Sequence, residues 1–190
     1  LTGMYSATGV LSALLHRERT GEGQHIDMAL LDVQLAALAN QNLNYLTTGK
    51  PPRRYGNAHP NIVPYQVFKS SNGSFVLAVG NDQQFRKFCT ASRLQVLCDD
   101  PRFITNTDRL ENRDALIPIV AERLAQEPTE HWIALLEPIG VPCASINRLD
   151  QAFVHPQVVH RELQINLPHT TGKTVPLVAN PIKFSQTEIE

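Results

Sequence analysis

Two short polar segments hold the side chains best suited to chemistry. Residues 55–60 read Tyr-Gly-Asn-Ala-His-Pro, and residues 80–85 read Gly-Asn-Asp-Gln-Gln-Phe. Between them, the Asn-Gly pair at 72–73 separates two alternating apolar runs, which is the strongest short-range signal for a β-hairpin. Because a hairpin returns the chain to the end where it started, we expect the two segments to lie at the same end.

Two interpretations of these segments are open. In the functional one they line the rim of a pocket, where Asn57, His59 and Asn81 orient a polar ligand. Asp82 would accept or carry a proton there. In the structural one, Asn81 or Asp82 only caps the helix that follows, and the His-Pro dipeptide forms a rigid turn.

Other patterns that could carry chemistry fail on their context. The Gly-Glu-Gly-Gln run at 21–24 follows a helical pattern, whereas a phosphate-binding loop precedes a helix, so we interpret it as a helix stop. The seven histidines form no H-E-x-x-H motif and no i, i+4 pair on a helix, so we expect no metal site. Cys89, Cys98 and Cys143 form no C-x-x-C motif, and we expect buried thiols in a reducing compartment.

The rest of the pattern supplies the elements that must position the two segments. Apolar residues recur every three or four positions up to about residue 17, which predicts an amphipathic helix. Alternating apolar and polar residues at 24–29 predict a short strand. Residues 31–46 carry apolar side chains at helical spacing and predict a second helix, which ends before consecutive prolines. The further elements that we expect are strands at 63–69 and 74–79, helices at about 83–92, 112–125 and 129–137 with Thr129 as the last one's N-cap, a strand at 143–146, a helix at 149–154 and a hairpin of 163–167 with 174–178.

This order of elements predicts a mixed α/β protein in which a small α+β domain is inserted into a larger one. The polar, proline-interrupted stretch after the second helix is the best candidate for a linker. The expected division is a helical segment of the large domain at 1–52, a linker at 53–64, the small α+β domain at 65–153 and a return to the large domain at 154–190.

The composition excludes several classes of protein. The chain has 190 residues, of which 42% are hydrophobic, enough to build a core. Its 17 Lys and Arg against 18 Asp and Glu, without a basic block, argue against nucleic acid or an anionic membrane as a partner. No apolar run approaches the roughly 20 residues of a membrane span. The first residues form neither an initiator Met nor a signal sequence, so we expect the chain to begin inside a longer protein.

Residues 3–32 closely resemble the class III CoA-transferases, the CaiB/BaiF family. The Arg-Thr-Gly-Glu-Gly-Gln block at 19–24 is the most specific part of this resemblance. The likeness continues in the family's order along nearly all of the chain. The further matching blocks are 55–65, 72–73, 80–85, 100–103 with Asn106 and Arg109, and 140–143 leading to 146–147.

The resemblance implies both a fold and a reaction. The fold is a Rossmann-like large domain with an inserted small domain, in a homodimer whose two subunits interlock, and the expected location is the cytoplasm or, in a eukaryote, the mitochondrial matrix. The reaction moves coenzyme A from an acyl-CoA to a free carboxylic acid. An aspartate attacks the thioester to give an acyl-aspartyl anhydride, then an aspartyl-CoA thioester.

The resemblance also implies where the chemistry lies in the chain. The nucleophilic aspartate is expected immediately upstream of Leu1, so this chain would contribute no catalytic residue, and most contacts to the CoA nucleotide would also come from the missing part. Coenzyme A would be a substrate, with no permanently bound cofactor. Asn57, His59, Asn81 and Asp82 are the expected substrate-binding residues.

Two other functions are compatible with the sequence besides CoA transfer. A racemase of the α-methylacyl-CoA type, in the same superfamily, exchanges an α-proton and uses a carboxylate in the segment that matches 80–85. Those racemases typically have Glu where this chain has Asp82, so the Asn-Asp pair favours the transferase. From a different class, the 190-residue chain alone would be an inactive scaffold.

Overall fold

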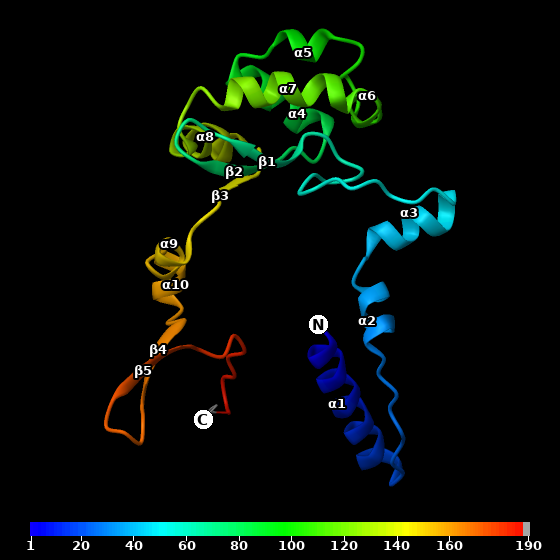
Figure 1. Ribbon diagram of the computed structural model, residues 1–190, viewed down its shortest axis with the longest axis vertical. Helices are drawn as coiled ribbons and strands as arrows, with labels where there is room; N and C mark the ends of the chain where they lie inside the picture. The colour runs from blue at the N-terminus through cyan, green and yellow to red at the C-terminus, as the bar shows by residue number, and fades with distance from the viewer. Residues whose placement is uncertain (188–190) are drawn as a thin grey trace. The chain divides into compact units, whose positions relative to one another are not determined.

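The computed structural model describes residues 1–187. Residues 1–55 form one unit, with helices α1 (Thr2–Thr20), α2 (Leu30–Ala36) and α3 (Asn40–Thr48) (Figure 1). Helix α1 ends where Gly21 takes a φ of 76° and donates its N–H to the carbonyl of Arg17 at 2.8 Å. Glycine adopts this left-handed conformation at little cost, and the predicted glycine stop is confirmed.

Two predictions for the first unit are wrong. Residues 24–29 form no strand, because a strand needs a hydrogen-bonded partner and no described residue of this unit is in a strand. The segment runs along α1 instead, and a methyl group placed on Gly9 would lie 3.6 Å from Cγ2 of Ile26. The helix expected over 31–46 is broken into α2 and α3 where Ala39 takes a φ of 48°, which an α-helix does not contain.

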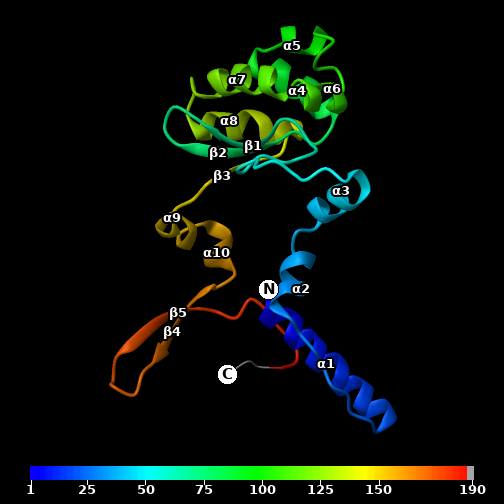
Figure 2. The ribbon, with the colours of Figure 1, turned by 45° about the vertical axis from the view of Figure 1, so that its right-hand side comes forward.

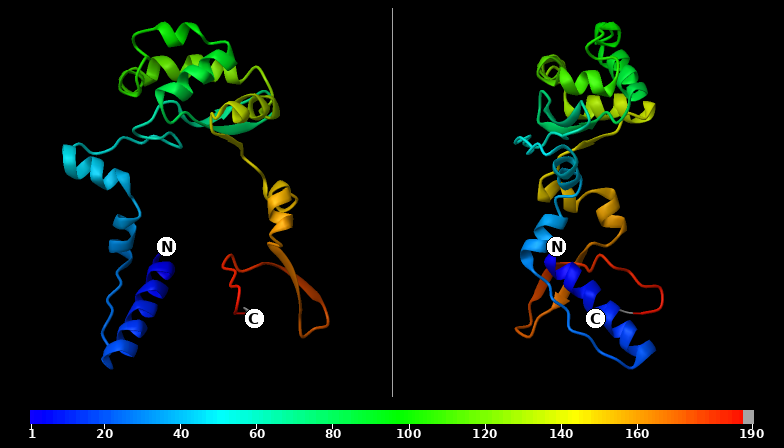
Figure 3. Two further views of the ribbon diagram at one scale, coloured as in Figure 1. Left: turned by 180° about the vertical axis from the view of Figure 1, so that it is seen from behind. Right: turned by 90° about the vertical axis from the view of Figure 1, so that its right-hand side faces the viewer.

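Helix α1, drawn in dark blue in Figure 3, has the expected apolar side chains, but none of its residues is buried in the described chain. Met4 is 71% exposed, Leu11 67% and Leu15 49%. Such a run of exposed apolar surface is typical of a face that packs against further protein.

The second unit begins at Gly56 and is organised around a three-stranded antiparallel sheet. Strands β1 (Tyr65–Lys69) and β2 (Ser74–Ala78) form the predicted hairpin, whose turn is closed by a 3.0 Å bond from the Ser70 N–H to the Gly73 carbonyl. Strand β3 (Cys143–Ser145) pairs with the other edge of β2, which gives the order β1-β2-β3.

Helices gather on one side of this sheet (Figures 1 and 2). Three were expected near their observed places, and the short helices α5 and α6 were not, because four to six residues show too little periodicity. The elements are α4 (Asp82–Ser92), α5 (Val96–Asp99), α6 (Asn106–Glu111), α7 (Arg113–Leu124), α8 (Thr129–Leu136) and a 3-10 turn, η1 (Glu137–Ile139).

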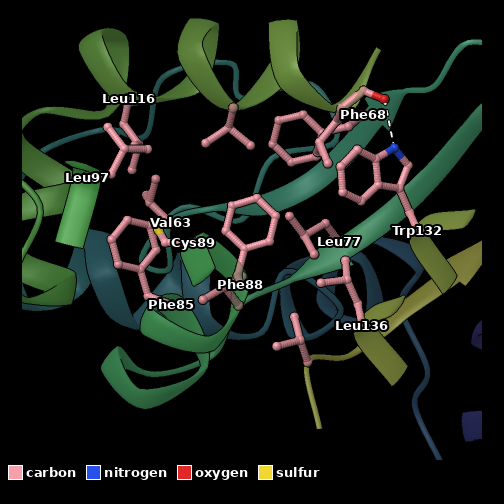
Figure 4. Close-up of a cluster of buried hydrophobic side chains, with 14 of the residues drawn as sticks. Val63, Phe68, Leu77, Phe85, Phe88, Cys89, Leu97, Leu116, Trp132 and Leu136 are labelled. Atoms are coloured by element: carbon pink, nitrogen blue, oxygen red, sulfur yellow. Dashed lines mark hydrogen bonds between the residues drawn. The ribbon is translucent and has the colours of Figure 1, made fainter. Parts of the chain in front are cut away.

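The core lies between the sheet and these helices (Figure 4). Phe75 and Leu77 of β2 face it together with Phe85 and Phe88 of α4, and all four are at most 1% exposed. The indole N–H of Trp132, in α8, donates to the carbonyl of Leu124 at 2.9 Å, which satisfies its one polar atom.

Two smaller predictions are corrected in part. Thr129 is the first residue of α8, and Pro128 stands at the N-cap position. The hydroxyl of Thr129 forms a hydrogen bond with the buried hydroxyl of Ser70 at 2.7 Å and caps no N–H of the helix. Of the three cysteines, Cys89 is buried, whereas Cys98 and Cys143 are only half-buried. Burial raises the pKa of both Cys89 and Cys143, so these thiols stay protonated at neutral pH.

The C-terminal part contains helices α9 (Leu149–Phe153) and α10 (Pro156–His160) and the hairpin of β4 (Gln164–Pro168) with β5 (Thr174–Val178). Helix α9 and the hairpin were expected, and α10 was not. The predicted mixed α/β class is confirmed. The four-part domain division stays a prediction, and residues 188–190 of its last part lie outside the described residues.

Candidate functional site

The segment before the hairpin is fixed along the free edge of β1. The side-chain Oδ1 of Asn57 accepts the N–H of Val67 at 3.0 Å, and the N–H of His59 donates to the carbonyl of Tyr65 at 2.8 Å. These backbone groups belong to the strand edge that β2 does not pair with. Asn57 therefore closes an open sheet edge, a role that its position in the sequence does not reveal.

The imidazole of His59 has a defined orientation and tautomer. Its ring stacks on Tyr65 with 5.2 Å between centroids and 12° between planes. Its Nδ1 accepts the N–H of Asn61 at 3.1 Å, so the neutral ring carries its proton on Nε2. Burial, followed by the nearby charge of Arg113, lowers the pKa of His59 below its ordinary 6.5. The ring is thus held neutral at physiological pH.

The segment after the hairpin is built around the start of α4. Asn81 is its N-cap, with Oδ1 accepting the N–H of Gln84 at 2.9 Å, so the predicted cap is confirmed at Asn81. The side chain of Gln84 accepts the N–H of Gly80 at 2.7 Å and donates to the carbonyl of Gly140 at 3.1 Å. The loop at 80–84 is therefore held at both ends.

Arg109 of α6 connects the two segments. Its Nε donates to the carbonyl of Val63 at 2.8 Å, and its Nη2 donates to Oδ1 of Asp82 at 2.8 Å. The Arg109 side chain is fully buried and lies over the ring of Phe85 at 4.4 Å, whereas the Asp82 side chain is 47% exposed. This ion pair ties the segment before the hairpin to the start of α4.

Two neighbours of Arg109 complete the connection. Asn106 accepts the N–H of Val63 at 3.1 Å through Oδ1 and donates to the carbonyl of Asn61 at 2.9 Å through Nδ2. Arg113, the first residue of α7, donates to the carbonyl of His59 at 2.7 Å. Helices α6 and α7 thus hold the backbone on which the candidate site is carried.

We call Asn57, His59, Asn81 and Asp82 the rim residues, after the pocket rim that the sequence predicts for them. Helix α6 bonds to Asn61 and Val63, which follow the first segment, and to Asp82 of the second. No hydrogen bond or ion pair between two rim residues occurs in the described chain. Among residues 1–187, no group of three or more His, Cys, Asp and Glu side chains could hold a metal ion.

The sequence motifs gave no role to Arg109, Asn106 or Arg113, whose side chains hold the candidate site in place. Each acts on partners more than 25 residues away, so no local spacing signals the contact. The one available signal was the family match at 100–103 with Asn106 and Arg109, which assigned no function to either residue.

A mixed α/β fold with polar segments before and after a hairpin is found in many classes of protein. The comparisons narrow it: the sequence model of CoA-transferase family III matches residues 1–190, and the chain belongs to this family. A succinate–glutarate CoA-transferase of Agrobacterium fabrum is 44% identical over 99% of this chain and 47% of the relative. The human succinyl-CoA:glutarate CoA-transferase is 37% identical over 97% of this chain and 42% of the relative.

Solved structures agree with the family. A CaiB/BaiF family protein from Brucella suis is 46% identical, with a TM-score of 0.77 over 100% of this chain and 49% of that one. Rv3272 from Mycobacterium tuberculosis, at 24% identity, shares the fold with a TM-score of 0.80 over 97% of this chain and 48% of that one. The chain spans about half the length of the relatives that it matches.

Proposed function

We propose that the whole protein transfers coenzyme A from an acyl-CoA donor to a free carboxylic acid. The observation that carries this proposal is the family match along the entire chain, together with curated relatives that are CoA-transferases. Those relatives are named for short dicarboxylates, including glutarate and, in Acetobacter aceti, oxalate. A succinyl-CoA donor and a glutarate acceptor are accordingly the first pair to test.

The proposed reaction proceeds through the protein's own carboxylate. An aspartate attacks the thioester carbonyl, which forms an acyl-aspartyl anhydride and releases the CoA thiolate. The thiolate then attacks the aspartyl carbonyl, releases the donor acid and leaves an aspartyl-CoA thioester. The acceptor carboxylate repeats these steps in reverse, so no water is consumed. We place this aspartate immediately upstream of Leu1.

The rim residues would contact the substrates from the small domain. Several of their polar atoms have no hydrogen-bond partner in the described chain, namely the side-chain nitrogens of both asparagines, Nε2 of His59 and Oδ2 of Asp82. A neutral imidazole and two amides can donate to a carboxylate or a thioester carbonyl without adding charge. This set suits an anionic acceptor beside a polar thioester.

The decisive experiment is a transfer assay with the whole protein. Formation of glutaryl-CoA from succinyl-CoA and glutarate, followed by chromatography, is the expected result. The 190-residue chain alone is the negative control, and we expect no turnover from it because the nucleophile is absent. Robust turnover by that chain would contradict our placement of the aspartate. Exchange of an α-proton in a 2-methylacyl-CoA, without need of an acceptor acid, would instead favour the racemase.

A further inference from the structure

We propose that Arg109 is a positioning residue, which holds the Asp82 carboxylate so that Asp82 can accept hydrogen bonds from the pantetheine arm of the CoA substrate. The inference rests on the proposed function and names the residue through which that site is organised. Arg109 lies under the rim and not on it, since its side chain is fully buried while that of Asp82 is 47% exposed. Arg109 would therefore act through Asp82 and not by touching substrate.

The pairing has an electrostatic reason. A buried guanidinium costs several kcal/mol unless a counter-charge and hydrogen-bond acceptors surround it. Among residues 1–187, Asp82 forms the one ion pair with Arg109, and the carboxylate of Asp108 also lies close enough to interact with its charge. The remaining partners, which hold the guanidinium in place, are the carbonyls of Val63, Phe103 and Ile104 at 2.8, 3.1 and 3.2 Å and the ring of Phe85.

A fixed guanidinium fixes the carboxylate in turn. The guanidinium donates one charge-assisted hydrogen bond, from Nη2, to this carboxylate, and such a bond restricts the distance and the direction of the acceptor oxygen. Oδ1 of Asp82 is used by Arg109 at 2.8 Å, and Oδ2 has no hydrogen-bond partner among residues 1–187. One oxygen is thus committed to the protein, and the other is available on a half-exposed side chain.

The charge of Asp82 selects its ligand. A carboxylate accepts hydrogen bonds and repels another carboxylate, so the acceptor acid is an unfavourable partner. The pantetheine arm of coenzyme A carries two amide N–H groups, which are suitable donors. The geometry therefore assigns Asp82, held by Arg109, to the CoA arm.

The test compares Asp82→Asn, Arg109→Lys and the double variant in the whole protein. Steady-state kinetics give KM for succinyl-CoA and for glutarate, and calorimetry gives Kd for free coenzyme A. Each single variant should raise KM for succinyl-CoA and Kd for coenzyme A about tenfold, the effect of one charge-assisted bond, with KM for glutarate nearly unchanged. In the double variant, KM for succinyl-CoA and Kd for coenzyme A should be no higher than in Asp82→Asn, because both substitutions remove the same interaction.

A matched control separates positioning from stability. Arg123 is partly buried, donates to the carbonyl of Ser92 at 2.7 Å and stacks on Trp132, but it contacts no rim residue. Arg123→Lys should lower the melting temperature and leave KM for succinyl-CoA unchanged.

Several outcomes would overturn the inference. Additive effects in the double variant would show that Arg109 does not act through Asp82. If Arg109→Lys fails to fold, unchanged Kd and KM in Asp82→Asn are sufficient to reject it. The whole protein could also lack transferase turnover while both variants bind coenzyme A more weakly than it does. That result would reject the proposed function and still support the positioning role of Arg109.

Discussion

At the residue scale, the rim residues differ in how much of their bonding capacity the fold already uses. Asn57 and Asn81 each give their amide oxygen to a backbone N–H, and His59 gives Nδ1 to another. Asp82 gives one oxygen to Arg109. The bonds within the fold therefore use one set of atoms, and the proposed contacts to substrate would use others on the same side chains. Substitutions can accordingly be chosen to remove one role at a time.

Asn81 allows such a separation. Asn81→Ala removes the cap of α4 and should lower the free energy of unfolding by about 1 kcal/mol in urea titrations. Asn81→Ser keeps a capping oxygen and removes the amide nitrogen, so stability should be nearly unchanged. If that nitrogen binds substrate, kcat/KM of the serine variant should fall about tenfold. An unchanged kcat/KM would limit Asn81 to capping.

His59 should make stability depend on pH. Folding lowers the pKa of His59 below 6.5, so the unfolded chain binds this proton more readily. The free energy of unfolding should consequently fall as the pH drops from about 7 to about 5. His59→Asn keeps an acceptor for the N–H of Asn61 and should remove this part of the dependence. Identical pH profiles for the two proteins would contradict the prediction.

At the scale of elements, helix ends decide how the site segments enter and leave. Helix α4 begins at the Asn81 cap and ends at Arg93, which takes a φ of 61° and a ψ of 35°. A side chain in this left-handed region is strained, whereas glycine is not. The end of α4 is therefore more costly than its start, although both are well defined.

Replacing that strained residue should stabilise the protein. Arg93→Gly is expected to raise the free energy of unfolding by about 1 kcal/mol. Arg86→Gly is the matched control, because Arg86 is exposed inside the same helix, where glycine costs about 1 kcal/mol. Urea unfolding of both variants measures the difference. Destabilisation by Arg93→Gly would show that the arginine side chain contributes more than the strain removes.

At the scale of the whole molecule, the apolar side chains of α1 indicate that this chain packs against more protein. Leu1, Met4 and Leu11 are each at least 67% exposed in the described chain. Water contact at so many apolar groups is unfavourable, by about 25 cal/mol for each Å². We expect further protein, such as a second copy, to cover them.

We predict that the whole protein is a homodimer, as the interlocked architecture of the family resemblance implies. Size-exclusion chromatography with light scattering should give twice the subunit mass at all practical concentrations. Added salt should not dissociate it, because apolar burial is not screened. A monomer of the whole protein would contradict the interlocked arrangement.

Local rules account for what the sequence by itself determined. The hairpin at 72–73, the glycine stop after α1 and the capping by Asn81 each depend on residues within about four positions. The order of the blocks that resemble the family predicted the family. The sequence also placed the two site segments at one end of the hairpin, since that follows from the turn alone.

Only the tertiary structure decided how the site is held. Asp82 pairs with Arg109 from 27 positions away, and Val63 contacts the same arginine across 46. Residues 24–29 alternate like a strand but have no strand to pair with, and Ala39 breaks a helix that its neighbours favour. The spacing of residues along a chain specifies periodicity and turn chemistry. Whether a charge can be buried, or a segment can pair as a strand, is decided by the distant residues that come to lie beside it.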